Sequence, residues 1–320
     1  GIVPHPIYVG FSLVCVGVSM CAGSRAGFWV VSPLVMLGCA ALVWGYERHD
    51  LVKRFGGMAR ARLSLPRDGD GAASWWDVAS VQVLVLLPWA VLYEVVGHIQ
   101  PRDVIGAHFS FERGWPVWVW TEAVYAGVYP FVILAPLAAR TSGVLRRFCV
   151  AGWVGTAIGM LGFVAIPLVA VPREFAGDGW LAWLLRMERG DGVGGYAAFP
   201  SFHVFWAMLA AWVYARRWKR WAGAAWLCAA AIAASCITTG MHAVVDVVGR
   251  AGLFAIAFHA GAVWQQILRG VERVANSWRE WRFGPVRVIN HGAYAGLGAM
   301  VGVAGASMLA GSESVGWIVL

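Results

Sequence analysis

The hydrophobic pattern of the chain consists of long apolar runs, separated by short segments that carry most of the charged residues. A helix needs about 20 apolar residues to cross the hydrocarbon core of a bilayer. We therefore predict an all-α, polytopic membrane helical bundle with about nine spans. The predicted spans are 7–24, 27–46, 76–97, 116–139, 148–171, 200–215, 221–240, 242–265 and 291–310.

The composition agrees with a membrane protein and excludes several other classes. Apolar residues make up 60% of the 320 residues and charged residues 13%, whereas soluble domains have about 45–50% and about 25%. This excludes a soluble globule, a disordered chain and a nucleic-acid-binding module. The six cysteines lie in or beside apolar runs without a CxxC pair, so we expect buried thiols and neither disulfides nor a zinc site.

The positive charges are concentrated in alternate connecting segments. Of the 25 lysines and arginines, 18 lie in four of these segments, which are 47–75, 140–147, 216–220 and 264–290. The intervening segments 98–115 and 172–199 carry acidic and basic residues in near balance. By the positive-inside rule the first set is cytoplasmic and the second faces outward. The net charge of +8 therefore reports topology, and we predict a multi-pass protein of the cytoplasmic (inner) membrane.

Residues that suit phosphoryl transfer gather at the outward ends of three predicted spans. His242 and Asp246 are four apart, so on a helix they share a face and the carboxylate can orient the imidazole. His203 follows Pro200-Ser201 at a helix start, where free amide groups bind anionic oxygen. Arg173 can hold a phosphate. One histidine would attack phosphorus while the other protonates the leaving group.

Over about residues 75–265 these motifs resemble the type 2 phosphatidic acid phosphatase superfamily, the membrane relatives of vanadium haloperoxidases. They look most like its inositol phosphorylceramide synthase-like branch, whose second motif often reads Pro-Ser-Phe-His. The resemblance implies a six-helix core in which His242 forms a phosphohistidine, Asp246 orients it and His203 is the general acid. It implies that Ser201 and Arg173 bind phosphate oxygens, on the extracytoplasmic side, without a metal or another cofactor.

The chain departs from this family at two cationic positions. The family's first motif has a lysine seven residues before its arginine and a proline after it, and these places hold Ile166 and Glu174. Its third motif has an arginine six residues before the histidine, where this chain has Cys236. Two of the usual phosphate clamps are therefore missing. The possible replacements on the same outer side are Arg113, Arg186 and Arg189.

The other polar residues within or beside the spans are interpreted more conservatively. A histidine at a span boundary is usually an interfacial residue, and this is the interpretation of His5, His98, His108, His259 and His291. Glu94 and Glu122 fall inside predicted spans, where a carboxylate is costly. They are candidates for lining a substrate path, with pairing to a neighbouring helix as the alternative.

The two ends of the chain predict separate modules. In residues 1–67, His5-Pro6-Ile7-Tyr8 and Glu47 resemble the isoprenylcysteine carboxyl methyltransferase-like family. The resemblance implies a partial two-helix segment, in which His5 and Glu47 would help to bind S-adenosylmethionine if it is functional. Because the family's leading helices are missing, we interpret it as a remnant or cut end of a fused domain. Residues 266–320 are predicted to form an amphipathic linker and the start of a further membrane segment.

Three functions follow from the sequence. The first is a lipid phosphate phosphatase with a phosphohistidine intermediate. The second is a phosphotransferase that moves a phospho-headgroup onto a lipid or polyol alcohol, as the resemblance to inositol phosphorylceramide synthases implies. The third is a non-catalytic lipid-binding membrane protein, which the missing clamps motivate. The expected partners are a lipid phosphate and the bilayer; sequence does not choose the lipid or the acceptor.

Overall fold

The computed structural model describes residues 5–22, 24, 26–43, 47, 51, 54, 61–97, 105–166, 168–189, 202–276 and 281–288. The chain divides into two compact units. One contains residues 1–62 and 264–320, and the other contains residues 63–263. The predicted domains 1–67, 75–265 and 266–320 stay predictions.

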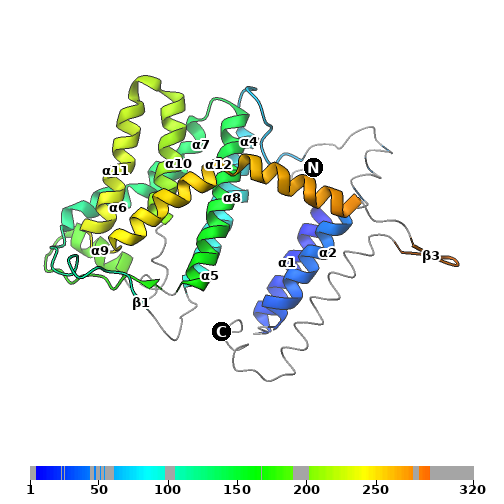
Figure 1. The fold of residues 1–320 in the computed structure, drawn as a ribbon, viewed down its shortest axis with the longest axis horizontal. Helices are drawn as coiled ribbons and strands as arrows, with labels where there is room; N and C mark the ends of the chain where they lie inside the picture. Colours follow the sequence, from blue (N-terminus) through cyan, green and yellow to red (C-terminus); the bar gives the residue numbers. More distant parts are fainter. Residues whose placement is uncertain are drawn as a thin grey trace. The chain divides into compact units, whose positions relative to one another are not determined.

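The first unit contains two helices near the amino terminus. Helix α1 (Pro6–Cys21) is followed by a π-helical turn η1 (Gly27–Val31) and by α2 (Ser32–Leu42). The two helices lie side by side (Figure 1), and the hydroxyls of Ser19 and Ser32 are 3.4 Å apart. A short antiparallel hairpin, β3 (Trp281–Phe283) and β4 (Val286–Val288), also belongs to this unit.

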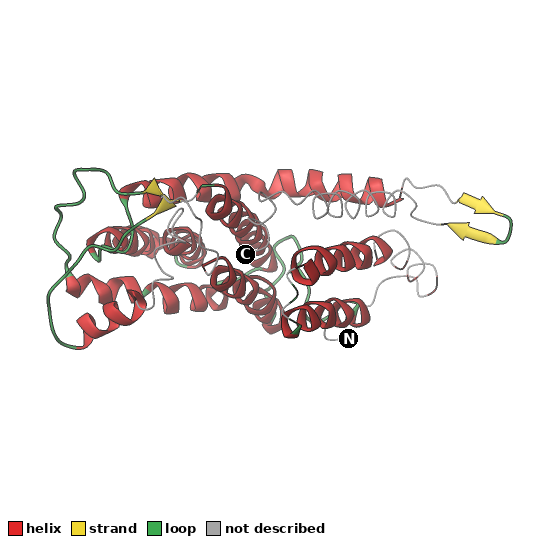
Figure 2. Ribbon diagram, turned by 90° about the horizontal axis from the view of Figure 1, so that it is seen from below, coloured by secondary structure: helices red, strands yellow, loops and turns green. Residues whose placement is uncertain are grey.

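The second unit is a bundle of helices (Figures 1 and 2). Its elements are α4 (Trp75–Val81), η3 (Gln82–Leu86), α5 (Leu87–Gly97), η4 (Val119–Thr121), α6 (Glu122–Ala126), α7 (Val128–Ala138), α8 (Ser142–Ala165), α9 (Trp180–Arg189), α10 (Phe202–Arg217), η5 (Lys219–Trp221), α11 (Ala222–Thr238) and α12 (Val244–Asn276). Local sequence fixes several of their starts. Ser74 and Asp77 form a reciprocal capping box at α4, and Thr141 caps α8, which satisfies amide groups that have no partner within the helix.

The mostly helical architecture of a membrane protein is confirmed. Helices overlap each predicted span from 7–24 to 242–265, and the span 291–310 lies outside the described residues. Within the described residues, four helical stretches are long and apolar enough to cross a bilayer. They are Trp75–Tyr93, Val119–Ala138, Lys219–Thr238 and Val244–Gly261. The full count of nine spans and the six-helix core stay predictions.

Two small sheets qualify the all-α prediction. Besides the β3–β4 hairpin, β1 (Ile105–Gly106) pairs in parallel with β2 (Leu168–Val169), with Ile105 opposite Leu168. Such strands are too short to show the alternation of apolar and polar residues by which strands are recognised in a sequence. The β1–β2 pairing joins the segment after α5 to the segment after α8.

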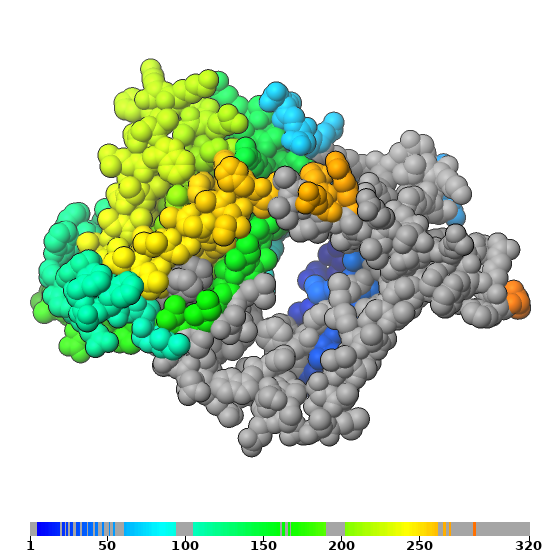
Figure 3. Space-filling model, viewed as in Figure 1, coloured from blue at the N-terminus to red at the C-terminus, as the bar shows by residue number. Residues whose placement is uncertain are grey.

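Helix α10 lies at the centre of the bundle, and all its side chains except that of Arg216 are buried or half-buried. Its aromatic residues pack into a row of glycines on α8 (Gly152, Gly155 and Gly159). A Cβ at Gly155 would lie 2.1 Å from Phe205 Cζ, so only glycine allows this approach of the two helices. Helices α11 and α12 cover the face of this unit seen in Figure 3.

Candidate functional site

The imidazoles of His203 and His242 lie next to each other, with ring centroids 5.6 Å apart. His203 is the second residue of α10, and His242 lies in the turn between α11 and α12. The two residues therefore come from separate helical segments, as the sequence predicts. Both are enclosed: His242 is 4% exposed, and His203 lies against the rings of Tyr125 and Tyr129.

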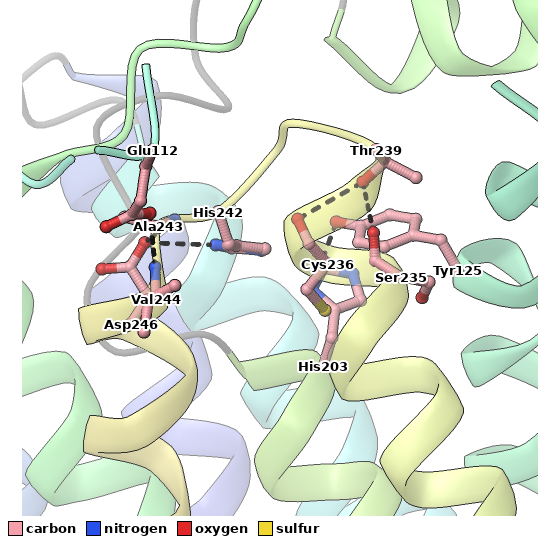
Figure 4. A network of polar contacts seen from close by, with 10 residues as sticks. All are labelled: Glu112, Tyr125, His203, Ser235, Cys236, Thr239, His242, Ala243, Val244 and Asp246. Carbon is pink, nitrogen blue, oxygen red and sulfur yellow. Dashed lines mark hydrogen bonds and ion pairs between the residues drawn. The ribbon is translucent and has the colours of Figure 1, made fainter. Parts of the chain in front are cut away.

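Asp246 stands behind the His242 ring. Its Oδ2 is 3.7 Å from His242 Nδ1 (Figure 4), which is longer than a hydrogen bond, although such catalytic contacts often tighten when substrate binds. The same oxygen accepts a hydrogen bond of 2.9 Å from the Ala243 amide. This is one half of a capping box at the start of α12. Capping thus fixes the carboxylate beside the imidazole that it is predicted to orient.

A second carboxylate, which the sequence analysis missed, also holds the start of α12. Glu112 is buried and accepts from the amides of Val244 (2.8 Å) and Phe109 (3.0 Å). An anion is favourable at the amino-terminal end of a helix. Glu112 therefore ties the segment 105–118 to the helix that carries Asp246. No sequence motif predicts this contact, because the partners of Glu112 are backbone amides 3 and 132 positions away.

Two arginines hold the turn that presents His242. Arg173 donates to the carbonyl of Ile237, and Arg189 donates to that of Thr239 at 2.5 Å. Basic side chains commonly bind the last carbonyls of a helix. The turn itself depends on Gly240, which has φ of +74°. A Cβ there would lie 3.1 Å from Arg189 Nη2 and 3.2 Å from Arg173 Cβ.

Arg173, which is predicted to bind phosphate, is occupied by backbone oxygens. Besides Ile237, it donates to the carbonyls of Trp115 (2.8 Å) and Glu112 (3.4 Å). Arg189 in turn donates to the carbonyl of Arg173 at 2.6 Å. Burial lowers the pKa of the Arg173 guanidinium from its ordinary value, although an arginine keeps its charge in a protein. Its contacts favour positioning of the turn, and phosphate binding by Arg173 stays a prediction.

The other possible clamps lie in different surroundings. Arg186 donates to the Gly177 carbonyl and stacks over Phe175 at 5.4 Å. Arg113 is exposed. Ser201 and the Glu94 side chain lie outside the described residues, so their predicted roles stay predictions.

Two tyrosines line the other side of His203, and two buried or half-buried acidic residues belong to the same unit. The Tyr125 hydroxyl is 3.3 Å from His203 Nδ1, and the Tyr129 ring meets His203 edge-on at 5.9 Å. Glu122 is fully buried, and its two oxygens have no hydrogen-bond partner among the described residues. Glu188 lies on α9, outside the apolar spans. Burial raises its pKa to about 7, and a hydrogen bond from Tyr129 partly opposes this shift. His203 is therefore bounded by two tyrosines, one of which also hydrogen-bonds to Glu188.

His108 and His259 differ although both are interpreted from sequence as interfacial. His259 is exposed on α12. His108 is half-buried, and its Nε2 has no hydrogen-bond partner in the part of the chain that the structure describes. Burial lowers its pKa, while the charges of Glu112 and Asp246 oppose that shift. His108 is therefore associated with the start of α12, which spacing alone does not predict.

Arg250 is a further residue that the sequence analysis missed. It lies on α12, four residues after Asp246 and eight after His242, and it is fully buried. The spacing that points to Asp246 would have pointed to Arg250 one turn further on, since residues four apart share a helix face. The clamps predicted from the sequence all lie in the segments predicted to face outward, whereas Arg250 lies within the predicted span 242–265.

In the other unit, the two residues predicted to bind S-adenosylmethionine lie together. His5 Nδ1 is 3.4 Å from Glu47 Oε2, across 42 residues of sequence. His5 directly precedes α1 and has φ of +48°. Arg48 and most of the residues after it, up to Arg60, lie outside the described part of the chain.

Comparison with known proteins supports the resemblance to the type 2 phosphatidic acid phosphatase superfamily. A family model described as the PAP2 superfamily matches residues 98–260, which is half of the chain and includes His203, His242 and Asp246. No curated protein sequence matches the chain.

Proposed function

Because the chain belongs to the PAP2 superfamily, we propose that it is a lipid phosphate phosphatase acting through a phosphohistidine at the outer face of the cytoplasmic membrane. The observation that carries this proposal is the 5.6 Å separation of the His203 and His242 rings, with Asp246 behind His242. Reacting groups must come within about 3–3.5 Å of the atoms on which they act. Two rings this close can each bring a nitrogen to one phosphate group bound beside them.

In this mechanism His242 attacks the phosphorus while the bond from phosphorus to the lipid oxygen breaks. His203, in its protonated form, gives a proton to the departing alkoxide, so that the lipid leaves as a neutral alcohol. Asp246 stabilises the positive charge that develops on the His242 ring. In the second step His203 takes a proton from water, whose oxygen attacks phosphorus, and the bond from phosphorus to nitrogen breaks. The products are phosphate and the regenerated histidines.

The acceptor in the second step distinguishes the phosphatase from the phosphotransferase that the inositol phosphorylceramide synthase-like motif implies. Both reactions pass through a phosphohistidine, which in the phosphotransferase also carries the headgroup of the donor lipid, and either water or an alcohol then attacks the phosphorus. Assays with phosphatidic acid alone, and with a headgroup-bearing phospholipid donor plus an added alcohol, separate them. Release of inorganic phosphate from phosphatidic acid supports hydrolysis, whereas movement of the phospho-headgroup to the alcohol supports transfer.

The decisive experiment is the substitution His242→Ala in protein purified in detergent. With short-chain phosphatidic acid as substrate, we expect phosphate release to fall at least about 10³-fold, as for other covalent nucleophiles. An unchanged melting temperature would show that the variant is folded. Wild-type turnover by the variant would exclude the phosphohistidine. Lipid binding without turnover by the wild-type protein would favour the non-catalytic alternative.

A second candidate function concerns the other unit, where the His5–Glu47 contact of 3.4 Å is compatible with a remnant of an S-adenosylmethionine site. A functional site should bind S-adenosylmethionine in a titration and lose binding on substitution His5→Ala or Glu47→Gln. No binding by the wild-type chain would restrict this contact to a structural role.

A further inference from the structure

Arg250 is a buried cation that has no polar partner of its own. It is 0% exposed, and its Nε, Nη1 and Nη2 atoms have no hydrogen-bond partner among the residues that the structure describes. A guanidinium carries five N–H donors and cannot lose its charge in a protein. Removal of a partner from a buried charge is strongly destabilising. A guanidinium in this state therefore needs an acceptor that the described residues do not supply.

Aromatic rings surround the guanidinium without satisfying its donors. Arg250 Cζ lies 3.8 Å from the centroid of the Phe202 ring and 5.8 Å from that of Phe163. A cation is attracted to the face of such a ring. A ring face accepts no hydrogen bond from the edge of a guanidinium stacked on it, so the N–H groups at that edge still need an acceptor. Gly159 on α8 makes room for this stack, because a Cβ there would lie 2.7 Å from Arg250 Nη1.

The stack places the cation at the start of α10. Phe202 is the first residue of that helix, and His203 is the second. The first amide groups of a helix have no acceptor within it and favour anions. The charge of Arg250 acts on both His203 and Asp246. The guanidinium is thus near the predicted general acid and at the helix end where a phosphate is expected.

Donors exceed acceptors in this part of the bundle. The indole nitrogen of Trp89, whose ring is 5.8 Å from that of Phe202, is buried and has no acceptor in the described residues. The same holds for Trp206, 5.5 Å from Trp89. On the acceptor side, Asp246 Oδ1 is buried and unpaired among those residues, but it forms no ion pair with Arg250 there. A surplus of buried donors is suited to an anion rich in oxygen.

We propose that Arg250 is the phosphate-binding arginine of this chain, supplying from α12 the cation that the family's motifs place at positions 166 and 236. The ligand is a phosphate ester anion, whose oxygens accept from the guanidinium fork while the Phe202 ring supports its face. The identity of this ligand as a lipid phosphate rests on the proposed function. The position differs from Arg173, whose Nη1 and Nη2 groups already serve backbone carbonyls.

Binding measurements test this directly, without requiring turnover. The probes are orthovanadate and dioctanoyl phosphatidic acid, titrated into detergent-solubilised protein, with uncharged dioctanoylglycerol for comparison. We expect Arg250→Met to raise Kd for both anions roughly 30-fold, the effect of losing charged hydrogen bonds, without changing Kd for dioctanoylglycerol. Arg250→Lys, which keeps the charge but not the fork, should weaken binding less.

The matched control is Arg147→Met. Arg147 also stacks on an aromatic ring of the same unit, 4.1 Å from that of Phe258, but it is exposed and has no role in the site. It should bind both anions like the wild type. Should Arg250→Met fail to fold, Arg250→Lys remains informative, because unaltered anion affinity with the lysine would contradict fork recognition.

The outcomes separate this inference from the proposed function. Wild-type affinity in a folded Arg250→Met variant would overturn the inference, while phosphate release that depends on His242 would leave the proposed function intact. Anion binding that depends on Arg250, without any turnover by the wild-type protein, would support the inference and reject the phosphatase. Failure of the wild-type protein to bind either anion would overturn the inference, whatever its activity.

Discussion

Two groups of arginines near the histidine pair differ in what their nitrogens bond. Arg173 and Arg189 donate to backbone carbonyls, chiefly those at the end of α11. Arg250 stacks on an aromatic ring and has no hydrogen bond within the described residues. The terminal Nη groups of the first pair serve the fold and only their Nε atoms lack a partner among those residues, whereas all three nitrogens of Arg250 are left for a ligand. Cations near a site are therefore not equivalent. The hydrogen-bond partners that each arginine already has indicate whether it positions the backbone or binds a ligand.

Among the substitutions that test this contrast, we expect Arg173→Met to have the largest effect. The substitution removes charged hydrogen bonds to three carbonyls, so the free energy of unfolding should fall by about 3 kcal/mol. The His242 turn would loosen, and kcat should fall about 10- to 100-fold with KM nearly unchanged. Thermal unfolding and steady-state kinetics in detergent measure both quantities. If KM instead increases strongly in a variant of wild-type stability, the result would indicate that Arg173 binds the phosphate.

Gly240→Ala tests the same turn without changing a charge. Gly240 has φ of +74°, and a new Cβ would press on Arg173 and Arg189. We expect a loss of about 1–3 kcal/mol in unfolding free energy and a decrease in kcat of roughly tenfold. The control is Gly223→Ala on α11, where a Cβ has no neighbour within 4 Å. Equal stability of the two variants would mean that the turn tolerates a side chain and that its geometry is not constrained by the arginines.

Gly159→Ala perturbs the Arg250 side of the comparison. Its Cβ would lie 2.6 Å from Phe202 Cζ and 2.7 Å from Arg250 Nη1, so the stack must shift. Overpacking of this kind costs about 1–3 kcal/mol, but a flexible guanidinium can absorb part of it. We expect KM for short-chain phosphatidic acid to rise about threefold, with kcat less affected. A decrease in kcat at constant KM would show that the stack serves catalysis by positioning rather than by binding the anion.

These contrasts also show which parts of the site are readable from sequence. The i, i+4 spacing of His242 and Asp246, and the start of α10 at His203, follow from local rules, and the structure brings these residues together. The helices themselves follow from hydrophobic length. Glu112 could not be predicted, because it meets backbone amides of α12 from a distant segment. The two-residue strands β1 and β2 have no periodicity to recognise.

Arg250 illustrates a different limit. Its position on the face of Asp246 is visible in the sequence, but its lack of partners is a property of packing between α8, α10 and α12. An arginine in an apolar span can be paired, exposed or occupied by a ligand, and sequence does not distinguish these states. Arg173 shows the converse, since a motif position alone does not reveal that its donors are already engaged.

The smallest expected effect concerns Glu188, an acidic neighbour of the outer arginines. Burial raises its pKa from the ordinary 4.5 to about 7, so the folded protein binds a proton more tightly than the unfolded chain. The contribution of Glu188 to the free energy of unfolding is therefore fully present below about pH 4.5 and is lost as the pH rises through about 7. Because Glu188 is partly solvated, we expect a change of only about 1 kcal/mol.

Glu188→Gln should flatten this part of the stability profile, and unfolding midpoints measured between pH 4 and pH 8 would reveal it. Glu174→Gln is the control, since it removes the same charge from an exposed residue of the segment 168–189. An unchanged slope in Glu188→Gln would mean that a neighbouring cation already compensates the carboxylate. In that case Arg189, the next residue in the chain, would interact with Glu188 as well as with the carbonyls of the turn. Arg173 and Arg189 would then not act on backbone groups alone.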